Sequence, residues 1–158
     1  MAPWYREISD GFCWLCYCMN DQCDAYKELV VINRGFIFIS IREELRKLVC
    51  PCCKKGNKRI RTYGEHQYSL IIRNCGFVNC QWAMRGALVN NKESKIFSEG
   101  QTYDNKLYTF KEIDHRNLWY KLEICIKQLA ENTQKNLSSD RAYHSSSSQT
   151  LDNMNMNI

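Results

Sequence analysis

Cysteine is the residue that most constrains how this chain can fold. Ten cysteines occur among 158 residues, and six of them form three short pairs separated by longer stretches of chain. Cysteines with such spacing either build a disulfide framework or bind a metal ion. The pairs are a C-x4-C at Cys18 and Cys23, a C-P-x-C at Cys50 and Cys53, and a second C-x4-C at Cys75 and Cys80.

The start of the sequence favours the metal over the disulfides. Residues 1–7 contain no long apolar stretch, so we expect no secretory signal peptide. The sequence also contains no run of about 18 apolar residues, so it predicts no membrane span. We therefore expect an intracellular protein of the cytoplasm or nucleus, where disulfides rarely persist. In that setting the cysteines are better interpreted as thiols or zinc ligands.

A structural zinc site needs four ligands arranged as a tetrahedron, and two short turns can supply two each. The C-P-x-C turn is the most specific, because Pro51 fixes φ and the amides that follow can point at a thiolate. Joining the first two pairs gives the pattern C-x4-C-x26-C-x2-C. This pattern predicts one structural Zn²⁺ held by Cys18, Cys23, Cys50 and Cys53.

The third pair leaves alternatives open. Cys75 and Cys80 could replace the first pair, could build a second site, or could pack as small buried hydrophobic residues. A second site would draw further ligands from Cys52, Cys16 or His66. We interpret four cysteines as packing residues or spare thiols: Cys13, Cys16, Cys52 and Cys125.

The apolar pattern predicts a small β-rich, zinc-ribbon-like domain over residues 8–128. Residues 1–27 have few periodic apolar positions and are expected to be rich in loops. Residues 28–41 are β-branched and aromatic but are interrupted at Asn33-Arg34-Gly35, which predicts a hairpin between the two cysteine turns. Alternating apolar residues from Leu118 to Ile126 predict a half-buried strand.

The remaining segments are less periodic. We expect strands at 68–73 and 107–110, a turn at 75–80 that continues along 81–88, and an exposed loop at 90–105. Residues 42–49 fit either a helical turn or a charged strand. Asn, Ser, Gln and Thr dominate the C-terminal part, so residues 129–158 are predicted to form a disordered polar tail.

The ligand type bears on catalysis. The strong pairs consist of cysteine alone, which favours a closed structural site over a catalytic zinc with an open position. The sequence contains no H-E-x-x-H, no deaminase signature and no Gly-rich phosphate loop. We therefore expect no enzymatic activity. A RING-like ligase component is an alternative, because ten cysteines could fill two sites, although alternating C-x2-C pairs are missing.

The charge pattern suggests partners. A basic loop follows the second turn, and the net charge of +5 is mild. Basic side chains bind phosphates and neighbouring aromatic rings stack on bases, so a single-stranded nucleic acid is one candidate partner; a solvated loop is the simpler interpretation. We place another protein first, with tryptophans as its anchors or as core residues. The candidate nucleic-acid contacts are Lys54, Lys55, Lys58, Arg59 and Arg61.

Four segments together resemble a known pattern. They are residues 18–26, 31–36, 50–53 and 75–82, which read C-x-N-x-x-C, V-I-N-x-G-F, C-P-x-C and C-G-F-x-N-C. This order is similar to a largely uncharacterised family of cysteine-rich domains of eukaryotic microbes, expanded in some fungi. The resemblance covers about residues 10–127. It implies a zinc-binding β domain and, because some members lie beside ubiquitin-like domains, a role in the ubiquitin pathway.

Overall fold

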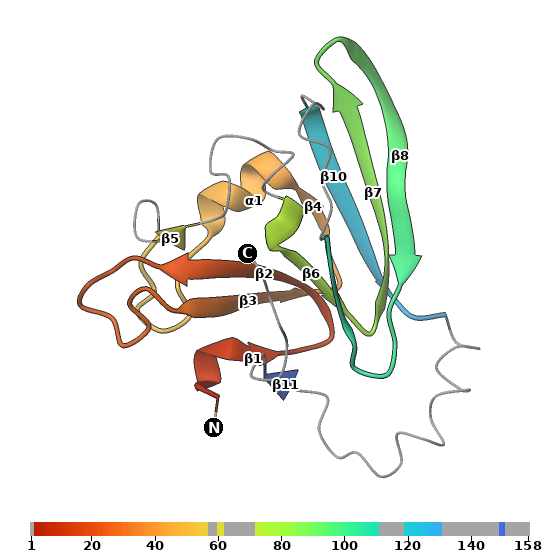
Figure 1. Ribbon diagram of the computed structural model, residues 1–158. Helices are drawn as coiled ribbons and strands as arrows, with labels where there is room; N and C mark the ends of the chain where they lie inside the picture. The colour runs from red at the N-terminus through yellow and green to blue at the C-terminus, as the bar shows by residue number, and fades with distance from the viewer. Residues whose placement is uncertain (1, 57–59, 62–71, 111–118, 131–148, 151–158) are drawn as a thin grey trace.

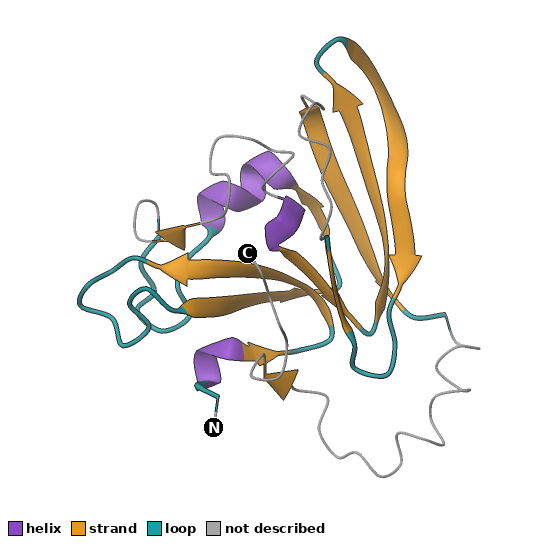
Figure 2. Ribbon diagram, viewed as in Figure 1, coloured by secondary structure: helices purple, strands orange, loops and turns teal. Residues whose placement is uncertain are grey.

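The computed structural model describes residues 2–56, 60–61, 72–110, 119–130 and 149–150. Most of these residues belong to two antiparallel sheets that pack against each other around one main core (Figures 1 and 2). The predicted class, a small β-rich domain, is confirmed. The elements are η1 Trp4–Arg6, β1 Glu7–Ile8, β2 Gly11–Cys18, β3 Leu29–Gly35, β4 Phe38–Ser40, α1 Ile41–Lys47, β5 Ile60–Arg61, η3 Ile72–Asn74, β6 Cys75–Val78, β7 Cys80–Leu88, β8 Asn91–Gln101, β9 Leu107–Thr109, β10 Trp119–Gln128 and β11 Gln149–Thr150.

The first sheet is built around β2. Its strand order is β3-β2-β6-β9, and the short β5 also pairs with β2. Every residue of β2 is buried except the half-buried Tyr17. Phe12 and Trp14 point into the main core, while Cys13 and Leu15 point into a second cluster on the opposite face. The loop-rich structure predicted for residues 1–27 is therefore wrong over β2, which is a strand covered on both faces.

The second sheet has the order β4-β10-β7-β8. Leu122, Ile124 and Ile126 of β10 are buried, so the alternation predicted for this strand is confirmed over its described residues. Across the core, Trp82 of β7 stacks on Phe77 of β6 with ring centroids 4.5 Å apart. This contact joins the inner faces of the two sheets, and it places Trp82 in the core.

The hairpin predicted over residues 28–41 is wrong. β3 pairs with β2 in the first sheet, whereas β4 pairs with β10 in the second. Gly35 has a φ of +72°, as a break in the strand requires, but the chain uses it to leave one sheet for the other. The Ile126 N–H donates to the Ile37 carbonyl at 2.9 Å, which fixes the chain where it reaches the second sheet.

Residues 41–47 form the helix α1, which settles the choice between helix and strand. The buried side of α1 includes Glu44, whose carboxylate accepts a 3.3 Å hydrogen bond from the indole N–H of Trp14. Arg34 of β3 donates to the same carboxylate through Nε at 2.9 Å and Nη2 at 2.8 Å. Glu44 thus ties α1 to two strands of the first sheet, just before the second cysteine turn.

Three further predictions differ from the structure. The exposed loop predicted at 90–105 is largely β8, whose residues are exposed as expected but pair with β7. The turn predicted at 75–80 is two strands, β6 and β7, joined at Asn79 with φ +48°. The strand predicted at 68–73 lies mostly outside the described residues, and its described end belongs to the 3-10 helix η3. The strand predicted at 107–110 is confirmed as β9.

The predicted C-terminal tail lies mostly outside the described residues. Leu129, at its start, is buried, and Gln149–Thr150 form β11, which pairs antiparallel with β1. Within the part of the chain that the structure describes, no helix is long and apolar enough to cross a membrane.

Candidate metal centre

The first cysteine turn begins where β2 ends, at Cys18. The backbone folds back through hydrogen bonds from the Cys23 N–H to the Asn20 carbonyl (3.0 Å) and from the Lys27 N–H to the Cys18 carbonyl (2.7 Å). The Asn20 side-chain oxygen also accepts from the Gln22 N–H at 3.2 Å, which tightens the turn. Lys27 has a φ of +61°, so the chain reverses there and returns as β3. The result brings the Cys23 thiol back beside Cys18.

The second turn follows α1. The Cys50 N–H donates to the Lys55 carbonyl at 2.9 Å, and the Lys54 N–H donates to the Cys50 carbonyl at 2.9 Å. These two bonds close a tight loop that contains Pro51. Gly56 ends the loop, and a Cβ there would lie 2.7 Å from the Leu48 carbonyl oxygen, so a larger residue does not fit. The loop presents Cys50 and Cys53 towards the first turn.

The four predicted sulfur atoms come together. The Sγ atoms of Cys18, Cys23, Cys50 and Cys53 all lie within 4.8 Å of one another. The Cys18–Cys53 and Cys23–Cys50 pairs are each separated by 3.9 Å between sulfurs. A tetrahedral zinc with Zn–S bonds of about 2.3 Å requires sulfurs about 3.8 Å apart. The thiols are free and not bonded as disulfides, so their spacing fits a four-thiolate metal site.

Each of the four sulfurs also accepts a backbone N–H from the residue two positions later. Two of these bonds measure 3.4 Å between nitrogen and sulfur. Donors of this kind stabilise the negative charge of a thiolate and fix its orientation. The donor and acceptor pairs are Asn20 to Cys18, Ala25 to Cys23, Cys52 to Cys50 and Lys55 to Cys53.

Burial and hydrogen bonding set the proton affinity of these thiols. Burial raises the pKa of Cys18 to about 12, against the opposing effect of the Asn20 N–H. Burial likewise raises the pKa of Cys50. Burial acts in the same direction on Cys53, but hydrogen bonds from the Asn20 side chain and the Lys55 N–H outweigh it and lower the pKa of Cys53 to about 7. A metal ion binding here displaces protons from Cys18 and Cys50.

The third cysteine pair does not join the cluster. Cys75 and Cys80 are buried, and burial raises the pKa of both thiols, that of Cys80 to about 12. Cys13 and Cys16 are buried as well, and burial raises the pKa of both thiols, that of Cys13 to about 12, which fits neutral packing residues. Within the described residues, no second group of three or more possible ligands lies within metal-binding distance. His66, a predicted alternative ligand, lies outside them.

Two cysteines remain. Cys52 is half-buried in the second turn, next to the cluster but not part of it. Burial is the main cause that raises the pKa of Cys52, and a hydrogen bond with the Cys23 side chain raises it further. Cys125 is half-buried on β10 in the other sheet. Both agree with the prediction of spare thiols.

The predicted basic contacts are only partly described. Lys54 and Lys55 are exposed, immediately after Cys53. Lys58 and Arg59 lie outside the described residues. Arg61 is part of β5, where its backbone pairs with Tyr17 of β2.

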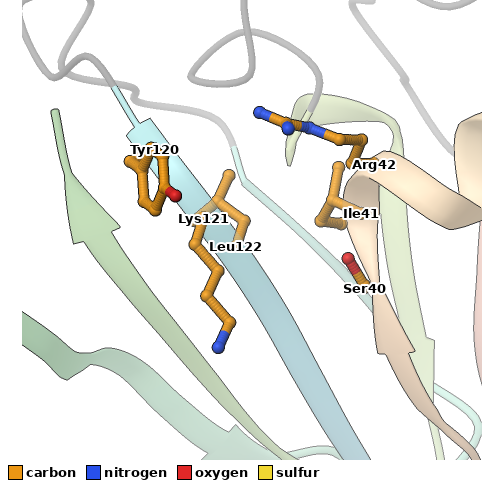
Figure 3. A pocket seen from close by; sticks show the side chains of 6 residues that line it. All are labelled: Ser40, Ile41, Arg42, Tyr120, Lys121 and Leu122. Atoms are coloured by element: carbon orange, nitrogen blue, oxygen red, sulfur yellow. The ribbon is translucent and has the colours of Figure 1, made fainter. Parts of the chain in front are cut away.

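A separate pocket of about 190 Å³ lies between the start of α1 and β10 (Figure 3). Its lining contains no histidine, cysteine or carboxylate, and it lies at the opposite end of α1 from the cysteine cluster. It therefore offers no further metal ligand. The lining residues are Ser40, Ile41, Arg42, Tyr120, Lys121 and Leu122.

The chain matches no protein-family model, and it matches no curated protein and no solved structure. The geometry and chemistry of the cysteine cluster therefore carry the functional argument. Sequence reasoning missed the contribution of Asn20, which serves both turns. An Asn two residues after a turn cysteine is a signal that could have pointed to it, because this side chain accepts and donates locally.

Proposed function

We propose that this protein is a non-enzymatic, zinc-binding interaction module in which Cys18, Cys23, Cys50 and Cys53 hold one structural Zn²⁺. The observation that carries the proposal is the approach of four free sulfur atoms to within 4.8 Å of one another. Four thiolates around one ion give a closed site, in which zinc adds stability and leaves no position for a substrate.

Zinc is the metal that this donor set favours. Four soft sulfur ligands in a tetrahedral arrangement are typical of Zn²⁺ or iron, whereas Mg²⁺ and Ca²⁺ require oxygen ligands. The two turns supply the ligands in pairs, as small zinc domains commonly do.

Native mass spectrometry with zinc quantification tests the site directly. We expect one zinc per chain in the wild-type protein. Cys23→Ser should lose the zinc, whereas Cys125→Ser, which removes a half-buried thiol from the other sheet, should keep it. A folded wild-type protein without metal, or equal zinc content in both variants, would refute the proposal.

The partner class is also part of the proposal. We propose another protein, recognised by the rigid turns around the zinc, and the family resemblance makes ubiquitin the first candidate. Titrating the zinc-loaded protein into isotope-labelled ubiquitin should produce saturable chemical-shift changes. Their absence would remove ubiquitin from the proposal and would leave the zinc site untouched.

The RING-like alternative makes a different prediction. A cross-braced RING scaffold binds two zinc ions with two interleaved sets of ligands, so two zincs per chain in the same mass-spectrometry experiment would favour it. The single cluster among the described residues supports the one-zinc module.

A further inference from the structure

The second cysteine turn carries an unusual concentration of positive charge. Arg46 and Lys47 end α1 just before the turn, and Lys54 and Lys55 follow it; all four side chains are exposed. No acidic residue occurs between positions 46 and 64, and the same stretch contains Lys58, Arg59 and Arg61. We call the four described side chains the basic flanks of the turn.

The backbone brings the two flanks together. Val49 and Gly56 form an antiparallel bridge, and the Cys50 N–H donates to the Lys55 carbonyl at 2.9 Å. Residues 49–50 and 55–56 therefore lie side by side, which brings Lys54 and Lys55 near the end of α1, where Arg46 and Lys47 lie. Figure 1 shows α1 and β5 at the same end of the molecule, beside the end of β2.

The metal centre does not neutralise this surface. Four thiolates and one Zn²⁺ carry a formal charge of −4 + 2 = −2, which must be included in the local electrostatics. The four side chains of the basic flanks carry +4 and Lys27 adds +1, whereas Asp21 and Asp24 of the first turn contribute −2, so the described charges around the two turns sum to −2 + 4 + 1 − 2 = +1. Lys58, Arg59 and Arg61 add three further positive charges in the same stretch of sequence. An excess of this size attracts polyanions.

An exposed aromatic ring lies beside the same site. Cys18, at the end of β2, is bridged to Tyr26 on one side and pairs with Ile60 of β5 on the other. The Tyr26 side chain is 38% exposed, and the Lys27 Nζ lies 5.1 Å from its ring centroid. An aromatic ring with neighbouring cations is a surface on which an unpaired base can stack.

We propose that the basic flanks and Tyr26 form a binding surface for single-stranded nucleic acid. The cations bind backbone phosphates, and the Tyr26 ring stacks on a base. A single strand is favoured over a duplex because α1 is the helix at this surface, and its seven residues span only about 10 Å. Nucleic acid is favoured over an acidic peptide because a base can stack on the exposed Tyr26 ring, whereas a carboxylate side chain cannot. This activity goes beyond the proposed zinc role, which only holds the turn in shape.

Fluorescence anisotropy with a short labelled oligothymidylate tests the surface. Four phosphate contacts predict a slope of log K against log salt of about −2.8, so affinity should fall roughly 50-fold between 50 and 200 mM salt. The Lys54→Gln/Lys55→Gln variant should have a slope of about −1.4 and should lose roughly 7-fold over this range. Tyr26→Ala should weaken binding without changing the slope, because it removes stacking and no charge.

The matched control is Lys92→Gln/Lys95→Gln. These two exposed lysines lie on β8 in the other sheet, and their loss changes the net charge equally. Zinc content is measured for every protein, so that loss of the metal site is distinguished from loss of the surface. The proposal is overturned if wild-type protein with its zinc does not bind the oligonucleotide, or if the control variant weakens binding as much. Preferential binding of polyglutamate would overturn it too, in favour of an acidic protein partner.

Discussion

Replacing Cys50 with serine should remove most of the stabilisation that the proposed zinc ion provides. The Cys50 thiol is buried, lies 3.9 Å from the Cys23 sulfur and accepts the Cys52 N–H at 3.4 Å. A serine side chain is shorter than a cysteine side chain, and its oxygen is a harder ligand than a thiolate sulfur. It is therefore a poor zinc ligand beside three thiolates. The variant therefore lacks one of the four ligands that the tetrahedral site requires.

The size of the effect follows from linkage. Structural zinc binds small domains with about 10–16 kcal/mol at pH 7, and about 12 kcal/mol corresponds to a Kd of about 1 nM. At about 1 µM free zinc, binding then adds about 4.1 kcal/mol to the free energy of unfolding. Each kcal/mol changes the Tm of a domain of this size by about 3–6 °C, so Cys50→Ser should lower Tm by about 12–24 °C. That loss is comparable to the total stability of many small domains.

Thermal melting followed by circular dichroism, with and without a chelator, measures this effect. The matched control is Cys52→Ser, two positions away, because Cys52 lies outside the cluster and the substitution keeps the N–H that bonds to Cys50. Cys52→Ser should melt close to wild type, and chelation should lower its Tm as it does for wild type. Cys50→Ser melting within 3 °C of wild type, or losing further stability on chelation as wild type does, would refute the reasoning.

Two further predictions follow from other contacts. Glu44→Gln should lower the free energy of unfolding by about 2 kcal/mol, because it removes a buried carboxylate that accepts hydrogen bonds from Arg34 and Trp14. The control Glu43→Gln, on the exposed side of α1, should change this free energy by less than about 0.5 kcal/mol. Urea unfolding measures both, and equal effects would contradict the role of Glu44. Zinc affinity should fall at least about a hundredfold per pH unit as pH decreases below 8, because the raised pKa values of Cys18 and Cys50 mean that binding releases both protons. Competition with a chromophoric chelator measures this dependence, and an affinity independent of pH would contradict thiolate ligation.

The cluster was predictable because each half of it is local. Cys18 and Cys23 lie five positions apart, as the first turn requires, and Cys50 and Cys53 lie three apart around Pro51. What the spacing left open was which pair completes the site. That choice depends on tertiary structure: β5 pairs with the end of β2, which brings the second turn to Cys18, while Cys75 lies in β6 within the core.

The sequence predicted a hairpin at Gly35 because this glycine does break the strand, but the break leads the chain to the other sheet. Gly35 does adopt a positive φ, as a turn glycine would. However, a Cβ on Gly11 would lie 2.4 Å from the Gly35 carbonyl carbon, so the start of β2 approaches the end of β3 very closely. The apolar β2 therefore takes β3 as its partner, and β4 continues to the other sheet. Periodicity shows that a strand exists, but it does not identify the partner strand.

β2 and β8 show two reasons why a strand can lack an alternating apolar pattern in the sequence. β2 is buried on both faces, so its apolar residues do not alternate, and its cysteines suggested a loop-rich turn instead. β8 is exposed on nearly all of its length, so it carries no apolar period at all. It is held by hydrogen bonding to β7 along one edge of the sheet. Neither strand has the one-sided burial on which pattern reasoning depends.

The arrangement of hydrogen bonds shows what the proposed metal ion would add at this end of the molecule. The backbone bonds of the first turn connect residues 18–28 to one another, and those of the second connect residues 50–55. Contacts between the turns are chiefly those of the sulfurs, at 3.9 Å for two pairs, with the Asn20 side chain reaching Cys53. Thiols at this distance attract each other weakly, and thiolates repel. In the proposed site, a zinc ion would replace that contact with four bonds, and so would join the end of β2 to the segment that follows α1.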